Sequence, residues 1–324
     1  MPFSSIFGHA GVIQKLSDAV QRDHLPTAYL FSGPNGVGKG VVAKALAQMI
    51  NCQRRSNCGQ CGSCKLFLRE SHPDLLIIEP VGSKFIRIGQ IQELIQTLAL
   101  RPAYAQKRVV ILKHAQEMNL EAANAFLKIL EEPPQDTLFI LTALDRAQLL
   151  ETIRSRCAQV SFAALEQSQI QGILQAKYRL TADVQTLCLA YSFGRLRREF
   201  VEKAPKLLSL RAQALHMLGN LQPRDMEGHL HQVEALLQQN LEFFFLEFLG
   251  HLLKDFSLLQ LGQEASLTNA DVVTELRPLA DRFQPEALEQ AFGAVIRAEE
   301  KLQSFAGRQL ALEALLVELK RGLV

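Results

Sequence analysis

A glycine-rich loop constrains the fold of this chain more than any other feature of its sequence. It has the spacing G-x-x-x-x-G-K and reads Gly33-Pro34-Asn35-Gly36-Val37-Gly38-Lys39-Gly40. The apolar run 29–31 precedes it, and the apolar helical stretch 41–50 follows it. A loop between a strand and a helix can surround an anion with backbone N–H groups at the positive end of that helix. The motif therefore predicts a P-loop domain of the α/β class.

The residues up to about 160 alternate short apolar runs with helical patterns. The runs 75–78, 109–112 and 138–141 show no clean polar alternation, which is typical of parallel strands covered on both faces. After residue 162 strand signals give way to helical periodicity. We predict an α/β parallel-sheet domain at 1–160, a small helical domain at 161–207 and a larger all-α domain at 208–324.

Composition excludes several classes of protein. The 324 residues include 35 basic and 33 acidic side chains, and a net charge of +2 is too balanced for a chain that coats nucleic acid. No uncharged apolar window approaches the ~20 residues of a membrane span. The N-terminus lacks the basic and apolar regions of a secretion signal. We therefore expect a cytoplasmic protein that does not enter a membrane.

The residues that would support ATP hydrolysis are missing around the loop. A Ser or Thr hydroxyl normally follows the P-loop lysine and binds Mg²⁺, but Gly40 stands there. The strand expected at 109–112 runs into Lys113, and no carboxylate follows before Glu117. Glu79, after the run 75–78, is a weak substitute because a proline turn follows it directly. The loop can bind an anion, whereas turnover should be very slow.

Four cysteines fall within thirteen residues just after the P-loop helix. Cys52, Cys58, Cys61 and Cys64 include two overlapping C-x2-C turns, the spacing of a tetrahedral zinc site. Four thiolate ligands would leave no position for water, so the zinc would be structural. An iron–sulfur cluster and free thiols are the alternatives.

Two further segments match a known family. They are 122–134, with the sequence AANAFLKILEEPP, and 149–157, with the sequence LLETIRSRC. The segment His72-Pro73-Asp74 adds to the match. The chain resembles AAA+ clamp-loader subunits, and among them the delta prime family of the bacterial DNA polymerase III clamp loader. The match is dense over about 5–200, whereas the rest agrees in length and pattern only. The first cysteine gap, of five residues, is shorter than is usual in the family.

The resemblance implies an AAA+-like domain, a helical lid domain and a helical collar domain within a ring of subunits. Its implied partners are the gamma/tau ATPase subunits and the delta subunit and, through the assembled complex, the sliding clamp and primed DNA. Lys113 and Gly40 favour a non-hydrolysing stator, meaning a rigid subunit that completes the ring, over a gamma/tau-like motor. The polymerase activity would belong to the holoenzyme.

The resemblance also assigns roles to particular residues. Arg156 of the Ser-Arg-Cys motif would act as an arginine finger on ATP bound to a neighbouring subunit. The alternative from the residues alone is that Arg154 and Arg156 form salt bridges at a helix end. Thr142 and Arg195 occupy the places of the two sensor residues. The degenerate P-loop is an anion-binding candidate, and its ATP binding stays open; its residues are Gly33, Asn35, Gly36, Gly38, Lys39 and Gly40.

Two other functions compete with the stator. One is an active clamp-loader ATPase that uses Glu117 or Glu79 as an unusual metal ligand. The other is a zinc-dependent DNA-binding module with a vestigial P-loop, which the small net charge disfavours.

Overall fold

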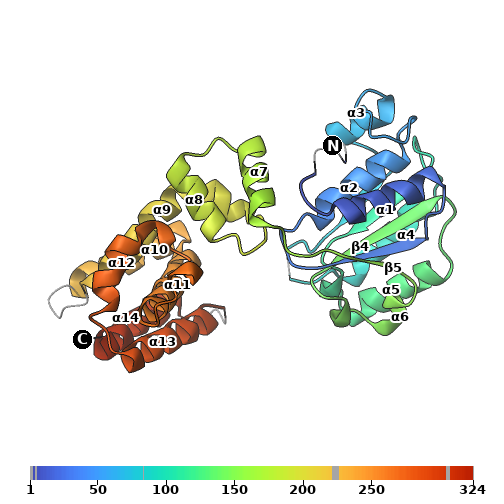
Figure 1. Cartoon of the computed structure of the whole chain (residues 1–324). Helices are drawn as coiled ribbons and strands as arrows, with labels where there is room; N and C mark the ends of the chain where they lie inside the picture. Colours follow the sequence, from blue (N-terminus) through green and yellow to red (C-terminus); the bar gives the residue numbers. More distant parts are fainter. Residues whose placement is uncertain (1–2, 4–5, 83, 221–225, 304–306, 324) are drawn as a thin grey trace. The chain divides into compact units, whose positions relative to one another are not determined.

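The computed structural model describes residues 3, 6–82, 84–220, 226–303 and 307–323. The chain divides into two compact units (Figure 1). Unit 1 comprises Met1–Tyr178 and Phe193–Arg197, and unit 2 comprises Arg179–Ser192 and Arg198–Val324. The division into domains at 1–160, 161–207 and 208–324 stays a prediction. Residue 207 itself lies inside the helix α9 (Arg198–Gly219).

Unit 1 is built on a parallel sheet of five strands in the order β2-β3-β4-β1-β5. The strands are β1 (Ala28–Ser32), β2 (Leu75–Ile78), β3 (Arg108–Leu112), β4 (Thr137–Ala143) and β5 (Ala158–Ser161). The sequence predicted the first four because their apolar runs are buried or half-buried. It missed β5, an edge strand that pairs with β1 only and is mostly exposed. The predicted α/β parallel-sheet P-loop domain is confirmed.

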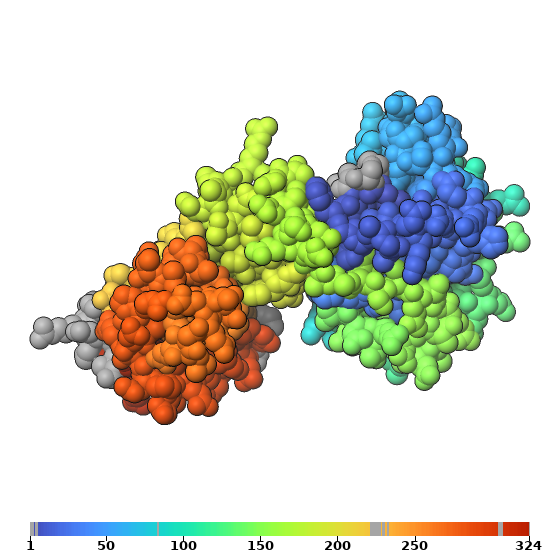
Figure 2. Space-filling model, viewed as in Figure 1, coloured from blue at the N-terminus to red at the C-terminus, as the bar shows by residue number. Residues whose placement is uncertain are grey.

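Helices cover both faces of this sheet (Figure 1). Alternate side chains of β1, β3 and β4 belong to two different cores, as the two-residue period of a strand requires. One core contains Leu30 and Val110, together with side chains of α4 (Ile88–Leu98), α5 (Leu120–Glu131) and α6 (Glu151–Arg154). The other contains Phe31 and Val109, with side chains of α1 (Ala10–Gln21) and α2 (Lys39–Ile50). The outer surface of α1 forms much of the dark blue face in Figure 2.

The remaining elements of unit 1 are short. They are α3 (Gly62–Leu68), α7 (Gln167–Lys177) and the 3-10 turns η2 (Ala115–Glu117) and η3 (Arg146–Gln148). Because β1 leads directly into residues 33–38 and α2 begins at Lys39, the glycine loop lies at the carboxyl edge of the parallel sheet. This is the edge at which open α/β sheets bind ligands.

Unit 2 is all-helical in the residues described there, as the sequence predicted. Its helices are α8 (Ala182–Ala190), α9, α10 (Met226–Gln239), α11 (Glu242–Gln260), α12 (Val273–Ala280), α13 (Pro285–Gln303) and α14 (Arg308–Leu323), with 3-10 turns η5 (Glu264–Ser266) and η6 (Ala270–Val272). The helical path breaks between α10 and α11, where Asn240 has a left-handed φ of 52°. The aromatic-rich α11 is the central core helix, with Phe248 and Phe256 fully buried.

A buried polar network ties α8 to the rest of unit 2. The Tyr191 hydroxyl donates to Asn269 Oδ1 at 2.8 Å. Asp255 on α11 accepts from the Asn269 backbone N–H and side-chain amide, each at 2.8 Å. Arg211 on α9 binds Asp271 with two hydrogen bonds of 2.8 and 2.6 Å. The chain is therefore fixed within unit 2 just before residue 193.

No helix in the described ranges combines the length and the apolar character that crossing a bilayer requires.

Candidate functional site

The first half of the glycine loop packs against its own chain. Gly33 has φ 144°, and a Cβ placed on it would collide with the carbonyl oxygen of Phe162. Gly36 has φ 80°, and its Cβ would lie 2.6 Å from the carbonyl oxygen of Leu196. His9 Nε2 lies 2.9 Å from the carbonyl oxygen of Val37. Because these two positions are glycines, the backbone of Phe162 and Leu196 can approach the loop more closely than it could if either position carried a side chain.

Two glycines in the second half of the loop have open space beside them. Gly38 caps α2 with φ 106°, and a Cβ on Gly38 or Gly40 would meet no atom within 4 Å. A Ser or Thr hydroxyl would therefore fit at position 40 without a steric conflict. The missing Mg²⁺ ligand is a feature of this sequence and not a consequence of crowding.

The P-loop lysine is turned toward the loop itself. Lys39 Nζ donates to the carbonyl oxygens of Gly33 at 2.5 Å and Pro34 at 2.7 Å. The residue is 8% exposed, and burial lowers the pKa of its ammonium to about 8. Because two of its three N–H donors are engaged by backbone carbonyls, the charge is directed into the loop.

The positions expected to hold a catalytic metal form an ion pair. Lys113 follows β3, and its Nζ lies 2.8 Å from Glu79 Oε2, after β2. Glu79 was the substitute ligand that the sequence offered, and here a lysine neutralises its charge. Glu117, the other substitute, closes the 3-10 turn η2. The two side chains are 30% and 49% exposed, so the pair itself is weak, but it places an ammonium group beside the one carboxylate that a divalent cation would need here.

The cysteine cluster has the geometry that its spacing predicted. The Sγ atoms of Cys52, Cys58, Cys61 and Cys64 all lie within 4.8 Å of one another. Zinc–sulfur bonds of about 2.3 Å place tetrahedral ligands about 3.8 Å apart, so small movements would complete a site. Cys52, which follows the short first gap, belongs to the cluster like the other three. These four residues could hold a metal ion, and no charged group of another type enters the set.

The surroundings of the thiols differ strongly. Burial opposes ionisation of Cys52, but backbone N–H groups of Cys58, Ser56 and Arg54 outweigh it and lower the pKa of Cys52 to about 6. Burial raises the pKa of Cys64 to about 12. Backbone N–H groups directed at sulfur stabilise the thiolate, which is the form that binds a metal ion. Burial also raises the pKa of Cys157 and of Cys188 to about 11, as expected of ordinary core thiols.

Arg156 lies at the surface of unit 1, in the turn between α6 and β5. Its Nη1 donates to the Thr152 carbonyl at 2.9 Å, and its Nη2 lies 2.9 Å from Glu131 Oε1 at the end of α5. The two side chains are 37% and 51% exposed. The salt bridge that was the alternative reading of Arg156 is therefore formed within this chain. A half-exposed pair of this kind still leaves the guanidinium accessible to a partner.

The two sensor-like residues lie in different settings. Thr142 on β4 is 5% exposed, and its Oγ1 accepts the His114 N–H at 3.2 Å. It therefore supports the turn after β3. Arg195 belongs to the segment 193–197 and lies against Gly36. Their sensor roles stay predictions. No sequence pattern pointed to Glu131 as the partner of Arg156 or to the approach of Leu196 to Gly36.

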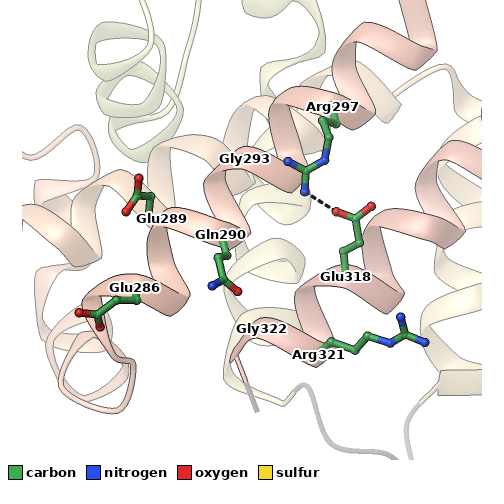
Figure 3. Close-up of a pocket in the computed structure, with 8 residues that line it drawn as sticks. All are labelled: Glu286, Glu289, Gln290, Gly293, Arg297, Glu318, Arg321 and Gly322. Carbon is green, nitrogen blue, oxygen red and sulfur yellow. Dashed lines mark hydrogen bonds and ion pairs between the residues drawn. The ribbon is translucent and has the colours of Figure 1, made fainter.

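An open hollow of about 650 Å³ lies in unit 2, and none of the predicted site residues lines it (Figure 3). It runs between α13 and α14, and Arg297 pairs with Glu318 across it at 2.5 Å. Glu286 and Glu289 point outward from α13 at its other end. Its lining has carboxylates, guanidinium groups and an amide, but no Cys, His, Ser or Thr. It offers no nucleophile and no metal site with soft ligands.

Known proteins resemble the chain along most of its length. Two sequence profiles match, "DNA polymerase III, delta subunit" at residues 8–166 and "DNA polymerase III, delta subunit, C terminal" at residues 205–321. The DNA polymerase III subunit delta' of Bacillus subtilis is 29% identical, and the alignment covers 96% of each chain. The subunit delta' of Pseudomonas aeruginosa is 40% identical over 41% of this chain and 42% of its own length.

A solved structure shares the fold. The DNA polymerase III gamma subunit-related protein of Thermotoga maritima superposes with a TM-score of 0.53 at 18% identity, covering 96% of this chain and 99% of its own. At this identity the superposition shows a shared fold. The family follows from the two profiles and the relatives named delta': the chain belongs to the delta prime family of DNA polymerase III subunits.

Proposed function

We propose that this chain is a non-hydrolysing stator subunit of the DNA polymerase III clamp loader. It would complete a ring with gamma/tau and delta subunits and help load the sliding clamp onto primed DNA in the cytoplasm. Lys113 carries the proposal, because the position directly after β3 holds an ammonium group, paired with Glu79, where a motor subunit has a carboxylate that binds the metal. Gly40 and the inward-turned Lys39 support it.

The first experiment measures Mg²⁺-dependent ATP hydrolysis by the purified chain. We expect negligible turnover, since no residue at position 40 or 113 can hold the metal that neutralises the phosphoryl group. Robust hydrolysis that Lys39→Ala abolishes would contradict the stator proposal and make the chain a motor.

Arg156 is the proposed arginine finger, acting on ATP held by a neighbouring subunit. Its support is the exposed guanidinium on a short turn, where its only carboxylate partner in the described structure, Glu131, is itself half exposed. Such a pair contributes about 0–1 kcal/mol, so a phosphate group can replace the carboxylate at little cost. A guanidinium supplied in trans stabilises charge on the transferring phosphoryl group.

Arg156→Ala in the reconstituted complex tests the finger. We expect DNA-stimulated ATPase to fall several-fold while the subunits still assemble, because a finger contributes about 10³–10⁵ in rate at the single site that it serves. Arg146→Ala is the matched control, an arginine whose Nη1 binds the exposed Gln159 side chain in the same region. Unchanged turnover in a stoichiometric Arg156→Ala complex would contradict the finger role.

We propose that the cysteine cluster binds one structural Zn²⁺. The support is the set of four Sγ atoms within 4.8 Å, with no position left for a catalytic water. Metal analysis of freshly purified protein should give about one zinc per chain, lost in Cys61→Ser and retained in the control Cys157→Ser. Iron with visible absorption, or clearly less than one zinc, would contradict it.

A further inference from the structure

A segment of five residues belongs to a different unit from the chain on either side of it. Residues 179–192 and 198–324 belong to unit 2, whereas the segment between them, Phe193–Arg197, belongs to unit 1. The buried Tyr191 anchors the chain in unit 2 immediately before this segment, and α9 begins immediately after it. The segment lies on the glycine loop and on residues 164–165. We call it the return segment.

The return segment meets the loop backbone to backbone. The Leu196 N–H donates to the Gly36 carbonyl oxygen at 3.0 Å. A Cβ on Gly36 would lie 2.6 Å from the Leu196 carbonyl oxygen and 3.2 Å from the Arg195 Cβ. Contacts of 2.6 Å between a Cβ and a backbone oxygen are too close to persist. The glycine at position 36 is therefore required for this approach, in addition to the requirement set by its φ of 80°.

A second contact fixes the other end of the return segment. The Leu165 N–H donates to the Gly194 carbonyl oxygen at 2.7 Å. A Cβ on Gly194, where φ is 75°, would lie 2.6 Å from the Ala164 Cβ. Two glycines with positive φ thus allow the close contacts that hold the segment. Gly36 of the loop allows the contact with Leu196, and Gly194 of the segment allows the contact with residues 164–165.

We propose that the glycine loop is a docking site for the chain's own return segment. In a nucleotide-binding loop the glycines admit a phosphate; here Gly36 admits the backbone of Leu196. Lys39, bound to the Gly33 and Pro34 carbonyls, holds the loop in the shape that receives it. Docking stiffens the connection between α8 and α9. The docking itself is independent of the proposed function; its usefulness to a stator rests on that function.

Hydrogen exchange at the Leu196 amide tests the docking in the full chain. We expect this amide to exchange about 100-fold more slowly than in an unstructured peptide. Gly36→Ala should abolish most of that protection. Gly38→Ala is the matched control, because Gly38 also has a positive φ but no atom within 4 Å of its Cβ position. Its effect on the Leu196 amide should stay within about threefold.

A second variant avoids changing the loop. Ala164→Val adds bulk against Gly194 at an exposed position, so the core is left intact, and Ala163→Val is its exposed control. Ala164→Val should speed Leu196 exchange and tryptic cleavage at Arg195 and Arg197, and Ala163→Val should not. Two results would overturn the docking. One is a Leu196 amide that exchanges in the parent chain as fast as in an unstructured peptide, and the other is an equal loss of exchange protection in a variant and its control. Clamp-loader ATPase is measured separately, so failure of the stator proposal leaves these readouts unchanged.

Discussion

Unit 1 contains two arginine–carboxylate pairs of the same chemistry, one buried and one half-exposed. Arg108 lies 3.6 Å from Asp74, and these side chains are 6% and 1% exposed. Arg156 lies 2.9 Å from Glu131, with side chains that are 37% and 51% exposed. The shorter pair is the weaker one, because water screens exposed charges and competes for their hydrogen bonds. Burial, and not distance, decides how strongly each arginine is held.

The surroundings reinforce the difference. Asp74 accepts backbone N–H groups of Ala103, Tyr104 and Ala105, each at 2.8 Å. Arg108 donates to the carbonyls of Thr97, Leu100 and Arg101. This network fixes the loop between α4 and β3. Arg156 has a single backbone acceptor and a half-exposed carboxylate partner, so it can exchange that partner, as the proposed finger would have to.

The largest effect is expected from Asp74→Ala. Removing this carboxylate leaves a buried guanidinium and three backbone donors without their acceptor, which should lower the free energy of unfolding of unit 1 by about 3–5 kcal/mol. Urea denaturation followed by circular dichroism measures the change, with Glu131→Ala as the exposed control. A loss below about 1 kcal/mol would show that the buried pair is no more structural than the exposed one.

Acid should weaken the buried pair at a lower pH than usual for a carboxylate. Burial opposes ionisation of Asp74, but the N–H groups of Ala103, Ala105 and Tyr104 and the charge of Arg108 outweigh it and lower the pKa. The contribution to stability is therefore complete above the unfolded value of about 3.9 and is lost as the pH falls through the lower folded value.

Unfolding free energies of the parent and Asp74→Asn, measured from pH 7 to pH 2, follow this loss. Their difference should be constant near neutral pH and shrink below about pH 4. A difference that does not change with pH would mean that Asp74 acts through hydrogen bonding alone and not through its charge.

The smallest effect is expected from Glu131→Gln. Its pair with Arg156 should contribute at most about 1 kcal/mol, and this contribution should vanish at high salt. A double-mutant cycle with Arg156→Ala, measured by urea denaturation at low and high ionic strength, gives the coupling energy. A coupling above about 2 kcal/mol that persists in salt would place Arg156 in the same structural class as Arg108 and weaken the finger proposal.

Local patterns account for the parts of the fold that the sequence predicted. The apolar runs of β1, β3 and β4 are buried on both faces of the sheet. Burial on both faces requires apolar residues at successive positions, and such a run is visible in the sequence. β5 was missed because, of its four residues, only Val160 is a large apolar residue and the strand lies at an exposed edge. No sequence pattern marks the break between α10 and α11, because Asn240 takes a left-handed φ there that any surface asparagine can adopt.

The P-loop, the cysteine cluster and the alternation of strands and helices could be predicted from the residues alone, because each depends on residues within a few positions of one another. Four other features appear only in the folded chain: the direction in which Lys39 turns, the pairing of Lys113 with Glu79, the pairing of Glu131 with Arg156 and the docking of Leu196 on Gly36. Three of these four contacts join residues far apart in the chain. No local pattern encodes such a pairing, because it depends on where the sheet and its connections bring separate loops together.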